Sequence, residues 1–128
     1  MSEINNTAAW VEKAEEDFLL AQSALRRKKP LVTGACFHAQ QCAEKYMKAL
    51  LVFRKAGFPR THDLLLLNTL CSSAGIFIEI DAKLLNTLSD YAVRTRYPGQ
   101  QPTPADAKEA LEITKLVRKL ARGFLGLR

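Results

Sequence analysis

The sequence of 128 residues predicts an all-α fold, an antiparallel bundle of five helices within a single domain. Apolar residues recur at steps of three and four along most of the chain, which is the spacing of amphipathic helices. Only the segment IFIEI, residues 76–80, alternates like a strand, and no second strand is available to pair with it. We therefore expect a loop or a helix start there.

The first predicted helix begins near Trp10 and ends at Pro30, which cannot continue a helix. Acidic residues fill its first half and basic residues 26–29 its end, the order that the helix dipole favours. Its apolar face consists of Trp10, Ala14, Phe18, Ala21 and Leu25.

The second predicted helix carries the longest apolar stripe of the chain, small at its start and large at its end. Small residues there allow another helix to approach closely. Gly57 and Pro59 are expected to close this helix. Glu44 and Lys48 are spaced for an ion pair on a solvated face. The stripe consists of Ala35, Ala39, Cys42, Ala43, Tyr46, Met47 and Leu50.

Three shorter patterns complete the bundle. A third helix is predicted to start near Thr61 to Asp63, and Asp81 can cap a fourth. Pro98 disfavours helix at the residue before it, so the fourth helix should end in the segment RYPGQQPTPAD. The last helix is predicted after Thr103, with Pro104 at a suitable first position.

Composition limits the classes of function. The chain is 48% hydrophobic and 25% charged, like soluble globular proteins, and it has neither a long apolar run nor a visible signal peptide. Its three cysteines form no Cys-x-x-Cys motif, so neither a disulfide framework nor a metal site is indicated. We expect a cytoplasmic protein without a cofactor. The net charge of +6 favours an acidic partner.

Four blocks of the sequence resemble one family. They are AEEDFLLAQ in the first helix, CFHAQQCAEKYMKALL in the second, PRTHDL after it, and TRYP at the end of the fourth. Their order and spacing resemble a HEPN domain (higher eukaryotes and prokaryotes nucleotide-binding) over about residues 10–124. The resemblance implies an up-and-down four-helix bundle with an additional short helix.

The resemblance also implies partners. It implies a homodimer packed through helices, and a minimal nucleotidyltransferase as the second component of a toxin–antitoxin-like pair. Members of the family bind nucleotides or RNA, and many are metal-independent ribonucleases with an Arg-x(4–6)-His motif. No histidine follows Arg94 or Arg96 at that spacing, so the ribonuclease residues do not carry over.

The preferred candidate site is the segment DYAVRTRYP, residues 90–98, with Arg94, Arg96 and Tyr97 as nucleotide- or RNA-binding residues. An arginine fork binds phosphate bidentately, and a tyrosine ring can stack on a base. The alternative is that Arg94 pairs with Asp90 or Glu44 inside the bundle.

Two further groups are weaker candidates. His38, Gln41 and Lys45 lie on one side of the second helix and could contact a phosphate or a base; alternatively, His38 is partly buried against a neighbouring helix. His62 opens the third helix, where a cap by Thr61 or Asp63 competes with phosphate binding.

A basic stripe lies on the last helix and is either a solvated face or a contact for RNA or an acidic protein. It consists of Lys115, Arg118, Lys119 and Arg122. Three functions follow from these candidates. The first is a dimeric nucleotide- or RNA-binding module. The second is a divergent ribonuclease that uses His38 with Arg94 or Arg96. The third is a structural adaptor.

Overall fold

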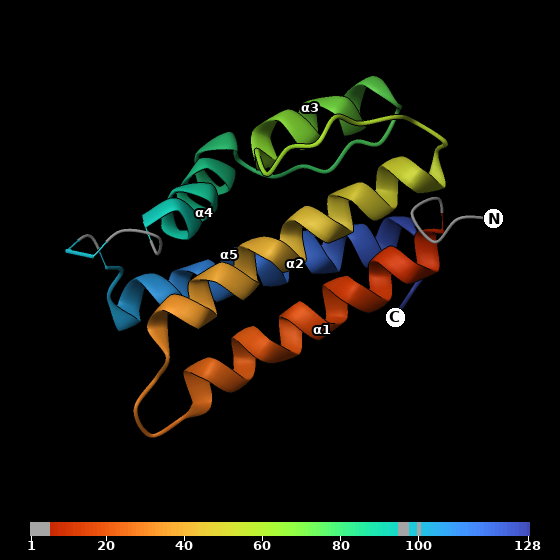
Figure 1. Cartoon of the computed structure of the whole chain (residues 1–128). Coiled ribbons are helices and arrows are strands. Elements are labelled where there is room, and N and C mark those ends of the chain that lie inside the picture. Colours follow the sequence, from red (N-terminus) through yellow and green to blue (C-terminus); the bar gives the residue numbers. More distant parts are fainter. Residues whose placement is uncertain (1–5, 95–97, 100) are drawn as a thin grey trace.

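A computed structural model describes residues 6–94, 98–99 and 101–128. These residues form five α-helices and no strand, which confirms the all-α prediction. The helices are α1 (Thr7–Arg26), α2 (Val32–Phe53), α3 (Leu64–Ser73), α4 (Ala82–Arg94) and α5 (Pro104–Phe124). The long helices α1, α2, α4 and α5 alternate in direction, and α3 is the additional short helix (Figure 1).

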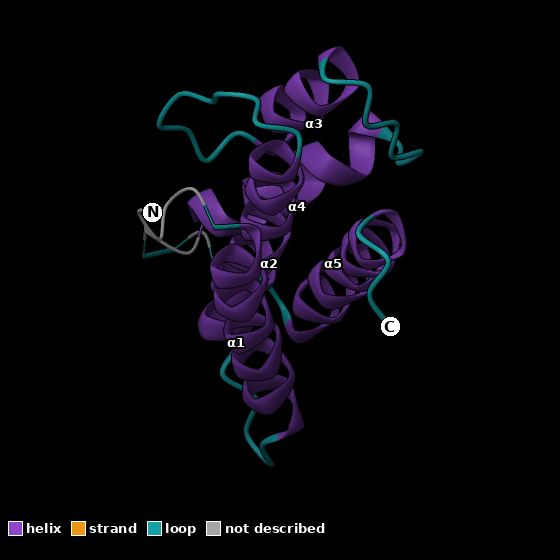
Figure 2. Cartoon of the chain, turned by 90° about the vertical axis from the view of Figure 1, so that its right-hand side faces the viewer, coloured by secondary structure: helices purple, strands orange, loops and turns teal. Residues whose placement is uncertain are grey.

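Helix α2 is the centre of the bundle and contacts all four other helices. Figures 1 and 2 agree that α1 lies on one side of α2 and that α3 and α4 lie on the opposite side. Helix α5 packs beside α2 and also contacts α1 and α4. A polar side chain on α2 therefore meets a different neighbour according to the side of the helix from which it projects.

The predicted stripe of α2 is the core of the fold. All seven of its residues are buried. Its small residues at the start let neighbouring backbones approach, as predicted: the Thr114 hydroxyl of α5 donates to the backbone carbonyl of Ala39 over 2.7 Å. The large residues Tyr46, Met47 and Leu50 fill the other end of the helix.

Two predicted helix ends were wrong by a few residues. Helix α1 ends at Arg26, before Pro30, and the backbone N–H of Leu31 returns to the carbonyl of Ala24 over 3.0 Å. Helix α2 ends at Phe53, and the left-handed residue after it is Lys55, with φ 58°, in place of a glycine. Backbone hydrogen bonds at the end of each helix close it before the proline or glycine is reached.

The predicted caps are confirmed. Asp63 accepts from two backbone N–H groups of the first turn of α3, and Thr103 and Asp106 form a reciprocal capping box at the start of α5. The segment IFIEI is a loop, as expected. Ile76 and Ile78 are buried, whereas Phe77 between them is 74% exposed.

Candidate functional site

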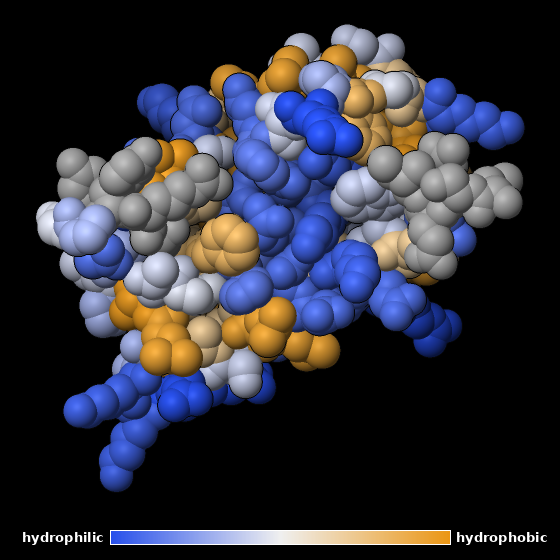
Figure 3. Space-filling view, in the orientation of Figure 1, coloured by the Kyte–Doolittle hydropathy of each residue, from blue (hydrophilic) through white to orange (hydrophobic). Residues whose placement is uncertain are grey.

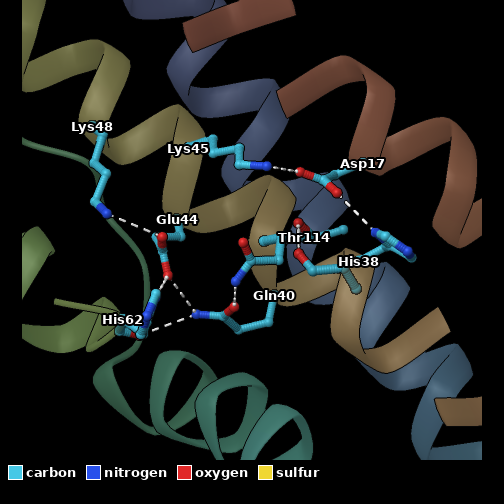
Figure 4. Close-up of polar contacts among 10 residues, drawn as sticks. Asp17, His38, Gln40, Glu44, Lys45, Lys48, His62 and Thr114 are labelled. Atoms are coloured by element: carbon cyan, nitrogen blue, oxygen red, sulfur yellow. Dashed lines mark hydrogen bonds and ion pairs between the residues drawn. The ribbon is translucent and has the colours of Figure 1, made fainter. Parts of the chain in front are cut away.

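Two buried carboxylates organise the polar side chains around α2. Asp17 of α1 is 6% exposed and Glu44 of α2 is 3% exposed. Figure 4 shows that His38 and Lys45 project from α2 toward Asp17 of α1, whereas Glu44 projects from the opposite side of α2 toward His62, in the connection before α3. A buried carboxylate is stable only when donors surround it, so each acid gathers basic and amide groups.

The Glu44 cluster consists of Glu44, Lys48, His62 and Gln40. Glu44 accepts from Lys48 Nζ at 3.0 Å, lies 2.8 Å from His62 Nδ1, and is 3.3 Å from the amide nitrogen of Gln40. The same amide nitrogen donates to the backbone carbonyl of His62 over 3.0 Å. These contacts fix the connection before α3 against α2 and hold the His62 side chain, which is 69% exposed, at the surface.

The prediction that Glu44 and Lys48 form an ion pair on a solvated face was wrong in one respect. The pair forms, but both residues are buried. The Lys48 ammonium lies 5.7 Å from the centroid of the Trp10 ring and 5.6 Å from that of Phe58, so aromatic faces cover it. The pair therefore belongs to the interior of the protein.

The Asp17 cluster consists of Asp17, His38 and Lys45. Asp17 lies 2.8 Å from His38 Nδ1 and accepts from Lys45 Nζ over 2.6 Å. The sequence placed His38, Lys45 and Gln41 on one side of α2, and the structure brings the first two together. Gln41 instead donates to the side chain of Gln40 over 2.8 Å. His38 is thus partly buried and bonded to a neighbouring helix.

The two clusters belong to a broad polar surface. Figure 3 shows a hydrophilic band across the middle of the face on which α2 lies in front of α5, with apolar patches beside it. Such a band on the central helix can bind polar ligands, but its most buried charges already have protein partners.

A third cluster uses part of the basic stripe of α5. Arg118 donates to Glu15 of α1 through Nε and a terminal nitrogen, each over 2.7 Å, and Tyr46 donates to the same carboxylate over 2.6 Å. Arg122 donates to the Tyr46 hydroxyl over 3.1 Å. The Arg118 hydrogen bonds hold the pKa of Glu15 below its ordinary value, and burial raises the pKa of Tyr46 to about 12.

Most of the basic stripe is therefore engaged within the protein. Arg118 and Arg122 join α5 to α1 and α2, and Lys115 pairs with Glu112 over 3.3 Å. Lys119 is exposed. The stripe acts chiefly as a structural contact.

Arg94, the preferred candidate, ends α4. Its Nε lies 3.3 Å from Asp90 and a terminal nitrogen lies 3.8 Å from Asp106, while its guanidinium is 5.0 Å from the centroid of the Tyr91 ring. Neither contact is a hydrogen bond of good geometry: Nε is buried without a hydrogen-bond partner among the described residues. Arg94 thus pairs with Asp90 of its own helix, which was the alternative to phosphate binding. The pairing is incomplete, because Nε lacks a well-formed hydrogen bond.

The other two preferred residues, Arg96 and Tyr97, lie outside the described residues. The structure does not bring His38 and Arg94 together. His38 is bonded to Asp17 on the α1 side of α2, whereas Arg94 contacts acidic residues of α4 and α5.

A pocket of about 290 Å³ lies between α2, the start of α3 and α4. Gln40 and His62 line one side, and Ser89 and Val93 of α4 line the other. The Ser89 hydroxyl oxygen is buried and has no hydrogen-bond partner among residues 6–94, 98–99 and 101–128. The Glu44 cluster therefore places His62 beside a pocket with an unsatisfied polar group.

Sequence reasoning identified the Glu44–Lys48 pair but not its burial, and it missed Asp17 as a buried acid. Asp17 was counted among the acidic residues of the first half of its helix, although it lies three residues after Ala14 and four before Ala21, next to the apolar face. That position was the available signal for a buried acid. Gln40 was missed as well, because no sequence pattern distinguishes a buried glutamine from an exposed one.

The described residues contain no group of three His, Cys, Asp or Glu side chains placed to hold a metal ion. No described helix combines the length and the apolar character needed to cross a bilayer.

The fold and the polar clusters define an all-α bundle organised around one central helix, which carries both the apolar core and buried polar side chains. The family model described as the HEPN domain matches residues 7–124, and the chain belongs to this family. The family expected from the four sequence blocks is therefore confirmed.

Two solved structures are similar over nearly their whole length. TT1696 from Thermus thermophilus has a TM-score of 0.73 and 26% sequence identity, covering 93% of this chain and 98% of its own. ST0689, an archaeal HEPN homologue, has a TM-score of 0.68 and 26% identity, covering 91% and 95% respectively. No curated protein sequence is significantly similar to the chain.

Proposed function

We propose that this HEPN domain is a cytoplasmic nucleotide- or RNA-binding module whose Arg94 contacts a phosphate. The observation that carries the proposal is the incomplete pairing of Arg94. Its buried Nε has no hydrogen-bond partner among the described residues, although a missing bond there costs about 1–3 kcal/mol. The side chain is 33% exposed, so a phosphate can reach the guanidinium and replace the long contacts with Asp90 and Asp106.

Substitution of Arg94 by lysine tests this function. Lysine keeps the charge but loses the planar fork, so we expect affinity for labelled single-stranded RNA to fall about tenfold, the effect of one charge-assisted hydrogen bond. Fluorescence anisotropy at low salt measures the affinity. The matched control is Arg54→Lys, because Arg54 is exposed and follows the end of α2. Absence of binding by the wild-type protein to both RNA and nucleotides would overturn the proposal.

The module is further proposed to act as a homodimer. The family resemblance supports this assembly, and so do Phe37 of α2 and Val93 of α4, two partly exposed apolar residues that line the same pocket. We expect light scattering to give about twice the chain mass of 14.3 kDa, and Val93→Asp to give the monomer. The control Phe77→Asp, in the exposed loop before α4, should remain dimeric. A wild-type monomer at high concentration would contradict the assembly.

The resemblance also supports a minimal nucleotidyltransferase as partner in a toxin–antitoxin-like pair. A tagged pull-down from the native cell, followed by mass spectrometry, is expected to recover such an enzyme in fixed ratio to the bait. Recovery of the bait alone, at protein concentrations that keep the dimer intact, would count against this partner.

A further inference from the structure

A second, larger cavity lies at the end of the bundle where α1 finishes and α5 begins. Its volume is about 530 Å³, which is within the range of small-molecule binding sites. Part of its lining is apolar: Leu25 from α1, Pro30 from the connection to α2, and Pro104 and Leu111 from α5. These groups offer an apolar surface to a ring, such as a nucleobase.

The rest of the lining consists of three basic residues with Gln22 and one acid, Glu112. Arg26, Lys108 and Lys115 line the cavity, and of these only Lys115 has a carboxylate partner, Glu112, among the described residues. Residues 27–29, the exposed Arg-Lys-Lys run, follow Arg26 in the connection between α1 and α2. Uncompensated cations beside an apolar lining suit a ligand that combines anionic groups with rings.

The cavity and Arg94 lie on nearly opposite faces of the first turn of α5. Arg94 approaches α5 at Asp106, whereas the cavity is lined by Pro104 and Lys108. Asp106 is two residues from each of them, about 200° around a helix with 3.6 residues per turn. A ligand that touches both places must therefore cross the end of the bundle at the start of α5.

We propose that this cavity is a second nucleotide-unit site, which receives one base of an RNA strand while a phosphate further along the same strand is bound at Arg94. The inference rests on the proposed binding function and narrows its ligand to a strand of several nucleotides. A mononucleotide reaches only one of the two places. The apolar lining favours a nucleobase over an acidic peptide, because carboxylate side chains would leave Leu25 and the two prolines uncovered.

The test measures binding of oligouridylates of about 4 to about 16 nucleotides, and of uridine monophosphate, by anisotropy and competition. Wild-type affinity should rise with length until the strand spans both places. The double variant Arg26→Ala/Lys108→Ala should bind long strands at least about tenfold more weakly. Its plot of log affinity against log salt should be shallower by about 1.4, which corresponds to two phosphate contacts on a single strand.

The matched control is Lys13→Ala/Lys83→Ala, which removes the same charge from exposed positions in α1 and α4. It should retain the wild-type salt slope. None of the four side chains is buried, so we expect both double variants to fold. Circular dichroism checks that they do.

Two results would overturn the inference while leaving the proposed function intact. One is length-independent binding that is weakened by Arg94→Lys but not by the cavity variant. The other is a cavity variant that loses binding to a polyglutamate peptide and keeps full affinity for RNA, which would assign the cavity to an acidic protein. Absence of all RNA and nucleotide binding by the wild type overturns the proposed function itself.

Discussion

Replacement of Glu44 by alanine is expected to lower the free energy of unfolding by about 3–5 kcal/mol, the usual cost of breaking a buried ion pair on one side. Glu44 is almost fully buried, and its removal leaves the Lys48 ammonium buried without a counter-charge. The rings of Trp10 and Phe58 compensate only part of that loss. Urea denaturation followed by circular dichroism measures the change.

The double variant Glu44→Leu/Lys48→Met separates the ion pair from the rest of the cluster. It removes both charges and fills their space with apolar groups, so most of the lost stability should return. The His62 side chain is exposed, so water can replace its lost contact with Glu44. If Glu44→Ala costs less than about 1 kcal/mol, the carboxylate is not the buried anchor described above.

Replacement of Ala39 by leucine is expected to destabilise the protein by about 1–3 kcal/mol through overpacking. Ala39 is fully buried on α2, and the hydroxyl of Thr114 on α5 lies 2.7 Å from its carbonyl oxygen. A larger side chain must push α5 or α1 away from the central helix. The thermal midpoint, measured by calorimetry, should fall accordingly.

Ala8→Leu is the matched control for this substitution. It adds the same atoms at an exposed position in the first turn of α1, where a change within about 0.5 kcal/mol is expected. Equal effects of the two substitutions would show that helix propensity, not the close approach of helices, limits stability. They would contradict the role assigned to the small residues of α2.

The helices and their buried faces could be predicted because their signals are local. The apolar stripe of α2 is specified by residues three and four apart, and each cap by residues within one turn. The ends of α1 and α2 were less predictable. Lys55 adopts a left-handed conformation where a glycine was expected, because the surrounding hydrogen bonds fix the chain end.

The polar clusters could not be predicted to the same extent because their partners are distant in sequence. Asp17 meets His38 and Lys45 from 21 and 28 residues away, and Glu15 meets Arg118 across 103 residues. Such pairs depend on which helices become neighbours and on how each is rotated. Arg94 and its possible pairing with Asp90 were identified from the segment DYAVRTRYP, but its contact with Asp106 required the structure.

The packing of Trp10 gives the protein an intrinsic optical reporter. Trp10 is the only tryptophan of the chain, and its ring meets that of Phe58, in the connection before α3, edge to face with centroids 6.0 Å apart. The Lys48 ammonium lies over both rings. Indole emission therefore arises from one environment, and a shift in it signals that the connection bearing His62 has left the central helix, without any attached dye.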